Sequence, residues 1–240
     1  MSNAVLYNVF TCWMVTLIGL AAARDLFARP RLTTAWRAFS WFWTLAAILW
    51  ALAGLRLLAY YLGLPRLDRL FFYGDEFFVA LHLAPAVIFV AESRWADRRL
   101  TVACGGFVAL FSLLFFVVFV AQGITRTIST DWASEHELPR AAFFCFLPAY
   151  LFCVALVVYS IISDVAARLR SGAWPDGERV LATAGMLVYS LAGIADVRGI
   201  WAGWRLLLIR VVYLTAALTA FWIGRSGRTR IEVVRGGRGE

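Results

Sequence analysis

The chain has 240 residues, of which 62% are hydrophobic and 16% are charged, and its formal net charge is +8. Soluble domains average about 45–50% apolar and about 25% charged residues, so this composition indicates an integral membrane protein. No polar stretch is long enough to form a soluble catalytic or nucleic-acid-binding domain. All 23 basic residues are arginine, and without lysine the chain cannot form a Schiff base with retinal or pyridoxal phosphate.

Seven apolar segments are long enough to cross a bilayer, which takes about 20 residues. Backbone groups cannot remain unpaired in lipid, so segments of this length must be helices. The first segment follows a short polar start without positive charge and is therefore interpreted as a span, not as a cleaved signal peptide. The predicted fold is an all-α membrane protein with seven spans at roughly 5–23, 38–63, 71–91, 100–122, 140–163, 179–200 and 204–224.

The arginines predict how these spans are oriented. With the N-terminus outside, fifteen arginines fall on the inner side, six on the outer side and two within spans. The positive-inside rule then favours an N-out, C-in protein of the plasma (inner) membrane. The basic charge is interpreted as contact with anionic lipids at the inner face, with no nucleic-acid partner. Residues 225–240, rich in Gly and Arg, are predicted to form a disordered cytoplasmic tail.

One sizeable outer loop joins the fourth and fifth spans and reads "ITRTISTDWASEHELP". Ser129 or Thr130 stands where the cap of a helix would stand. The loop is therefore expected to contain a short helix lying across the outer face, with Trp132 as an interface anchor.

The two halves of the chain align without a gap at an offset of 139 residues. Asp25 falls on Asp164, Arg29 on Arg168, and "LAG" at 52–54 on "LAG" at 191–193. The alignment predicts two parallel three-helix repeats, 5–91 and 140–224, joined by a linker helix at 100–122 within one domain spanning 1–224.

This 3+1+3 topology with an outer N-terminus resembles that of the SWEET sugar transporters. The helix count and orientation are also similar to those of opsins and G-protein-coupled receptors. The proline pattern of the SWEETs and the opsin lysine are both missing, so no functional residue is carried over from these families.

Charged residues are costly inside a membrane and usually pair or face a cavity. Six of them fall at similar depth, in the outer third of the second, third, sixth and seventh spans, and three acids match three arginines. This cluster is interpreted as an ion-pair network that locks helices, as a substrate or ion site, or as side chains that extend to the interface. The cluster, with His82 about two turns deeper than Asp75, comprises Arg56, Asp75, Glu76, His82, Asp196, Arg198 and Arg210.

His82 is predicted near the middle of the membrane, either hydrogen-bonded to a neighbouring helix or lining a cavity. The second histidine, His136, falls in the outer loop, so a haem with two histidine ligands is not expected. Pro85 and Pro148 are expected to kink the third and fifth spans. Tyr60, Tyr73, Tyr189 and Tyr213 could supply hydroxyls or stacking faces to a ligand.

No motif for catalysis, metal binding or phosphate binding is present in the sequence. The four cysteines lie in apolar runs without metal-ligand spacing, so no metal and no cofactor are expected. The sequence therefore favours a non-enzymatic protein that binds or transports a small solute. The alternative is an accessory, scaffold or sensory subunit that has a membrane-protein partner.

Overall fold

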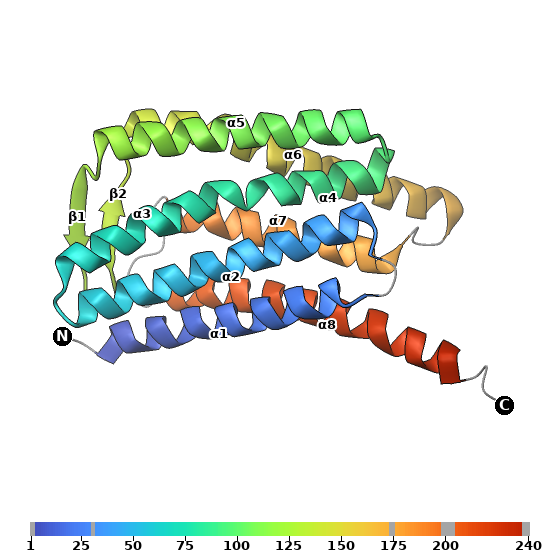
Figure 1. The fold of residues 1–240 in the computed structure, drawn as a ribbon, viewed down its shortest axis with the longest axis horizontal. Helices are drawn as coiled ribbons and strands as arrows, with labels where there is room; N and C mark the ends of the chain where they lie inside the picture. The colour runs from blue at the N-terminus through green and yellow to red at the C-terminus, as the bar shows by residue number, and fades with distance from the viewer. Residues whose placement is uncertain (1–2, 30–31, 173–175, 198–204, 237–240) are drawn as a thin grey trace.

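The computed structural model describes residues 3–29, 32–172, 176–197 and 205–236, with backbone alone for 194–197 and 227–236. The chain is nearly all helical. Figure 1 shows the helices running side by side along one direction. The helices are α1 Asn3–Phe27, α2 Thr34–Tyr61, α3 Pro65–Leu81, α4 Leu83–Trp95, α5 Arg98–Gln122, α6 Arg140–Ser171, α7 Gly177–Val197 and α8 Arg205–Gly236, and the strands are β1 Arg126–Ser129 and β2 Ser134–Glu137.

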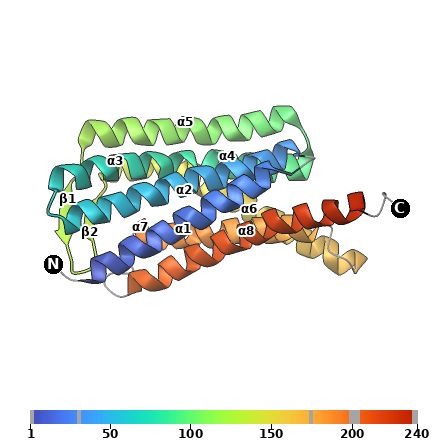
Figure 2. The same ribbon diagram turned by 60° about the horizontal axis from the view of Figure 1, so that its bottom comes forward.

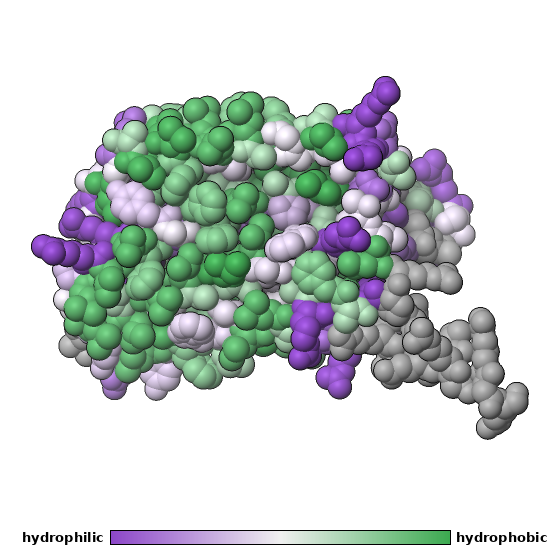
Figure 3. Space-filling view, in the orientation of Figure 1, coloured by the Kyte–Doolittle hydropathy of each residue, from purple (hydrophilic) through white to green (hydrophobic). Residues whose placement is uncertain are grey.

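Within the described residues, six helical segments are long and apolar enough to cross a membrane. One of these segments, Pro65–Trp95, contains both α3 and α4, and α7 is not among the six. Figure 3 shows a broad apolar surface between hydrophilic residues at the two ends of the bundle. The chain is therefore a multi-pass membrane protein, while the count of seven spans, the repeat and the orientation stay predictions.

Local sequence signals explain where several helices begin. Thr33 precedes α2, and its hydroxyl accepts a hydrogen bond from the Trp36 amide at 3.4 Å. Asp97 precedes α5, and its carboxylate accepts from the Arg99 amide at 2.8 Å. Pro65 opens α3, where its missing N–H costs nothing because the first amides of a helix have no partner within it.

The break between α3 and α4 falls where the sequence predicts a kink. α3 ends at Leu81 and α4 begins at Leu83, with His82 between them. Because Pro85 has no amide hydrogen, the Leu81 carbonyl loses its helical partner and the helix is interrupted there. By contrast, Pro148 lies inside α6, which runs as one helix from Arg140 to Ser171.

The loop between α5 and α6 forms a β-hairpin, so the prediction of a short helix in it is wrong. β1 and β2 are antiparallel, with Arg126 opposite Glu137 and Ser129 opposite Ser134. Thr130 closes the turn, since its hydroxyl accepts from the Ala133 amide at 3.0 Å. Hydroxyl side chains serve turns as well as helix caps, and β-branched residues before the turn favour a strand.

The helices other than α5 pack in a ring. α1 contacts α2 and α8, α2 contacts α3 and α4, α4 contacts α6, and α7 lies between α6 and α8. α5 packs on the outside against α3, α4 and α6, and Figures 1 and 2 both show it at one edge of the bundle. The hairpin lies beside the start of α1, at one end of the bundle. The end of α8 lies at the opposite end (Figure 1).

Small residues let α1 and α2 approach closely. A Cβ added at Gly19 would lie 3.3 Å from the Ala47 Cβ, and one added at Gly54 would lie 3.0 Å from the Trp13 indole nitrogen. Membrane helices associate through such close packing, because lipid offers little hydrophobic force to drive them together.

Candidate functional site: a polar cavity beneath the hairpin

A cavity of about 1040 Å³ lies between α2, α3, α6, α7, α8 and the hairpin. Apolar and aromatic side chains form much of its wall, and charged side chains converge on it from α2, α3, β2, α6 and α8. Pockets for drug-sized ligands have volumes of about 300–1,000 Å³, so this cavity is large enough for a small organic molecule. Its charged and histidine side chains among the described residues are Arg56, Asp75, Glu76, His82, Glu135, His136, Glu137, Arg140 and Arg210.

Arg56 of α2 and Asp75 of α3 form an ion pair on the cavity wall. The Arg56 Nη1 lies 3.6 Å from the Asp75 Oδ2, and the two side chains are only 13% and 10% exposed. The guanidinium also lies 5.2 Å from the centre of the Phe72 ring. Charges withdrawn from water this far need a partner, so this pair stabilises the packing of α2 against α3.

Glu76 follows Asp75 on α3, and both carboxyl side chains line the cavity. Neighbouring residues on a helix point about 100° apart, so the two acids reach different parts of the cavity wall. Glu76 is only 7% exposed. The pair therefore presents two separate acidic positions on the cavity wall.

Arg210 enters the cavity from α8 and is 6% exposed. Its Nε donates a hydrogen bond to the Asn8 side-chain oxygen at 3.1 Å. The guanidinium also lies 4.6 Å from the centre of the Trp50 ring, a cation–π contact. The guanidinium is therefore fixed in place by groups on α1 and α2.

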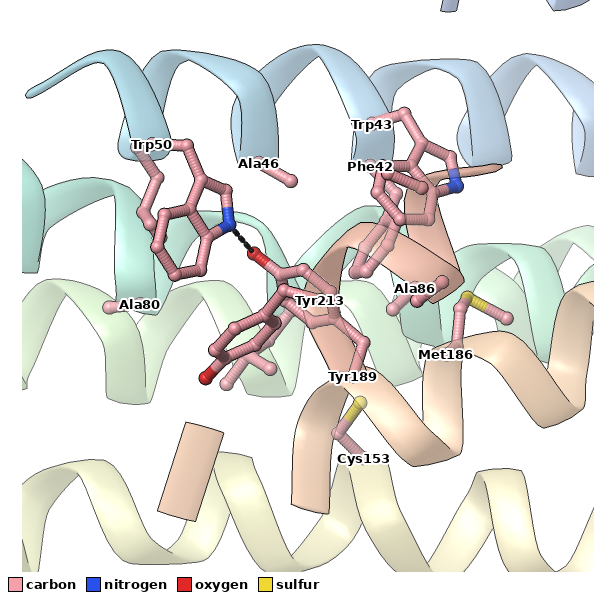
Figure 4. Packing of buried hydrophobic residues seen from close by; sticks show 14 of the residues in the cluster. Phe42, Trp43, Ala46, Trp50, Ala80, Ala86, Cys153, Met186, Tyr189 and Tyr213 are labelled. Carbon is pink, nitrogen blue, oxygen red and sulfur yellow. Dashed lines mark hydrogen bonds between the residues drawn. The ribbon is translucent and has the colours of Figure 1, made fainter. Parts of the chain in front are cut away.

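Aromatic side chains form another part of the cavity wall. The Trp50 indole N–H donates to the Tyr189 hydroxyl at 2.9 Å, which joins α2 to α7 across 139 residues of sequence (Figure 4). The Tyr213 ring centre lies 4.5 Å from that of Trp50 and 4.9 Å from that of Tyr189. His82 reaches the same region, with its ring 5.6 Å from Tyr189 and its Nδ1 3.0 Å from the Phe78 carbonyl oxygen.

The hairpin is attached to α2 and α3 by specific contacts. The Asp68 carboxylate accepts from the Ser134 hydroxyl at 3.0 Å and lies 3.1 Å from the His136 Nε2. The Tyr60 hydroxyl donates to the Thr130 carbonyl oxygen at 2.9 Å. These contacts hold the hairpin over the cavity, which Glu135, His136 and Glu137 also line.

Five of the seven cluster residues predicted from the sequence line this one cavity: Arg56, Asp75, Glu76, His82 and Arg210. Asp196 belongs to α7, but its side chain lies outside the described residues, as does all of Arg198. Of the four tyrosines, Tyr189 and Tyr213 line the cavity. Tyr60 instead bonds to the hairpin, and Tyr73 stacks on Phe119 at 4.8 Å.

The sequence did not identify a second ion-pair group, at the end opposite the hairpin. Asp164 was placed at the start of a loop, but α6 extends to Ser171 and turns this carboxylate into the bundle. Its oxygens lie 2.8 Å from the Arg94 guanidinium and 2.7 Å from that of Arg179. Arg29 of the α1–α2 connection and Glu178, the residue before Arg179, form a further pair at 3.1 Å. The sequence feature that set Asp164 apart was its alignment with Asp25 at the offset of 139 residues.

His136 is another residue whose role the sequence did not reveal. It was expected in an outer loop, but its side chain is 1% exposed and is enclosed by Asp68 and the Phe72 ring, 4.7 Å away. His136 lies in β2, where successive side chains point to opposite faces, whereas the helix interpretation of "STDWASE" gave no reason to expect a strand there.

Comparisons with protein-family models, with curated proteins and with solved structures found no match to the chain. The fold and the site therefore define only a class, that of helical multi-pass membrane proteins with a polar cavity in the bundle. Within the described part of the chain, no group of three or more His, Cys, Asp and Glu side chains is arranged to hold a metal ion.

Proposed function

We propose that this protein binds or transports a small solute across the plasma (inner) membrane, and that the cavity beneath the hairpin is its binding site. The observation that carries the proposal is the convergence of Arg56, Asp75, Glu76 and Arg210 on one cavity of about 1040 Å³. Charges that only locked helices together would be expected to pack against one another without space between them. Here they line a space that a ligand can fill.

The distribution of ion pairs along the bundle also supports this function. At the end opposite the hairpin, Asp164 joins α4, α6 and α7 through Arg94 and Arg179. None of these three side chains lines the cavity. A solute site that opens towards one side of a membrane needs such an arrangement, with a cavity at one end and tightly paired helices at the other.

We propose binding in place of catalysis for the acidic residues. Asp75 is paired with Arg56, and Glu76 points to another part of the wall. In this function the acids hold the arginines in position or accept a proton or a cation from the solute, and the arginines bind an anionic group.

A ligand screen by thermal shift on the purified full chain in detergent tests the proposal. We expect some solutes to raise the melting temperature of the native protein and to have no effect on Arg210→Gln and Asp75→Asn. Arg126→Gln, at an exposed position of β1, is the matched control and should keep the response. A purified protein that responds to no solute, and that is recovered only with a protein partner, would support the alternative function as a subunit of a membrane complex.

A further inference from the structure

We propose that the ligand of this cavity is a zwitterionic amphiphile, a molecule with a carboxylate, an ammonium group and an aromatic or apolar body. This inference rests on the proposed solute-binding function and specifies its substrate class. It follows from three features of the wall: a fixed guanidinium, separate carboxylates and a group of aromatic rings.

The guanidinium of Arg210 is suited to a carboxylate. It is buried, it lines the cavity, and Asn8 and Trp50 fix its orientation through one hydrogen bond and one ring contact. The planar fork of arginine matches the two oxygens of a carboxylate, and an arginine already held in place loses little freedom on binding.

Carboxylates on other parts of the wall are suited to an ammonium group. Glu76 projects from α3, and Glu135 and Glu137 project from the hairpin. Among the described lining residues, four carboxylates (Asp75, Glu76, Glu135, Glu137) stand against three guanidinium groups (Arg56, Arg140, Arg210). A zwitterion can pair with both signs at once, its carboxylate with a guanidinium group and its ammonium group with a carboxylate on another part of the wall.

The aromatic side chains supply the surface for the body of the ligand. Trp50, Tyr189 and Tyr213 line the cavity and lie in mutual contact (Figure 4). Phe143 and Phe146 of α6 form part of the same wall. Aromatic faces favour apolar and aromatic groups, and the volume exceeds what a single small amino acid would fill.

A matched set of three dipeptides tests the charge requirement. The set is phenylalanyl-phenylalanine, its N-acetylated form, which lacks the ammonium group, and its C-amidated form, which lacks the carboxylate. Affinities are measured by calorimetry on the full chain in detergent. We expect the zwitterion to bind about tenfold more tightly than either blocked form, since each charged hydrogen bond contributes on that order.

Substitutions assign the two charges to their partners. Arg210→Gln should remove the preference for the free carboxylate over the amide. Among Glu76→Gln, Glu135→Gln and Glu137→Gln, made one at a time, at least one should remove the preference for the free amine over the acetyl form. Arg210→Lys keeps the positive charge but loses the paired N–H donors of the guanidinium group. It should therefore reduce the carboxylate preference without a loss of helical content. Arg126→Gln should retain both preferences.

The outcomes separate this inference from the proposed function. Equal binding of all three dipeptides, or tighter binding of a blocked form, overturns the zwitterion but leaves solute binding in place. The same holds if the dipeptides fail and other solutes bind in a manner that depends on Arg210. If no dipeptide and no solute in the wider screen binds, both the ligand class and the function are overturned.

Discussion

Asp164 shows how strongly a single carboxylate can determine packing in this bundle. Its side chain is 1% exposed, and it contacts arginines from two other helices, Arg94 of α4 and Arg179 of α7. Arg94 also donates from its Nε to the Ser160 hydroxyl at 2.9 Å, and Arg179 donates to the Ser93 carbonyl oxygen at 3.2 Å. Removing the acid would leave two arginines close together without their shared counter-charge.

We therefore predict that Asp164→Asn lowers the free energy of unfolding by about 3 kcal/mol, the loss expected when one partner of a buried ion pair is removed. Equilibrium unfolding in mixed detergent micelles, followed by circular dichroism, measures this change. The control is Asp131→Asn at the exposed turn of the hairpin, which should have little effect. If the two variants were equally stable, Asp164 would not hold the helices together.

At the scale of elements, the hairpin depends on its contacts with the helices. Two strands of four residues are marginally stable in isolation. Asp68 is the main attachment, because it bonds to both Ser134 and His136. The hairpin should therefore open more often when this carboxylate is lost.

We predict that Asp68→Asn increases the rate of amide hydrogen exchange across residues 126–137 by roughly tenfold, because one charged hydrogen-bonding group contributes about 1.5–3 kcal/mol. Hydrogen exchange followed by mass spectrometry measures the rate. Arg69→Gln, at the exposed neighbouring position on α3, should leave the rate unchanged. Unchanged exchange in Asp68→Asn would show that the other contacts suffice to hold the hairpin.

The long helices could be predicted from the sequence, because each is a long run of mostly apolar residues. The sequence also predicted the break near Pro85, because a missing amide hydrogen acts locally. It did not predict that α6 continues past Asp164, because a charge at the end of an apolar run suggests a loop until its partners on α4 and α7 are known. The hairpin was missed for a similar reason, since Thr130 can begin a helix or close a turn.

The part of the candidate site that could be predicted is the set of charged residues that lie at the same depth in the membrane. Arg56, Asp75 and Arg210 were grouped because helices of known rise place them at one level. The cavity between them, the role of Asn8 in holding Arg210, and the contribution of the hairpin depend on which helices are neighbours. That information comes from packing and cannot be obtained from depth.

At the scale of the whole molecule, the hairpin and the end of α8 lie at opposite ends of the bundle (Figure 1). The arginine distribution predicts that the hairpin faces outward. Single cysteines in a chain whose four native cysteines are replaced by serine can test this. We predict that an impermeant maleimide labels Ser129→Cys in intact spheroplasts and labels Ser171→Cys only after lysis. The reverse pattern would show the opposite orientation.

Trp50 and Tyr189 are separated by 139 residues, which is also the offset at which the two halves of the sequence align. If the halves descend from one duplicated unit, a residue that touches its own counterpart lies on the axis that relates them. In an ancestral pair of identical chains, two tryptophans at this position would present two donors and no acceptor. A tryptophan facing a tyrosine requires two copies that mutate independently, as the two halves of a duplicated chain can. Under the predicted repeat, this hydrogen bond would mark a position at which two originally equivalent halves became different.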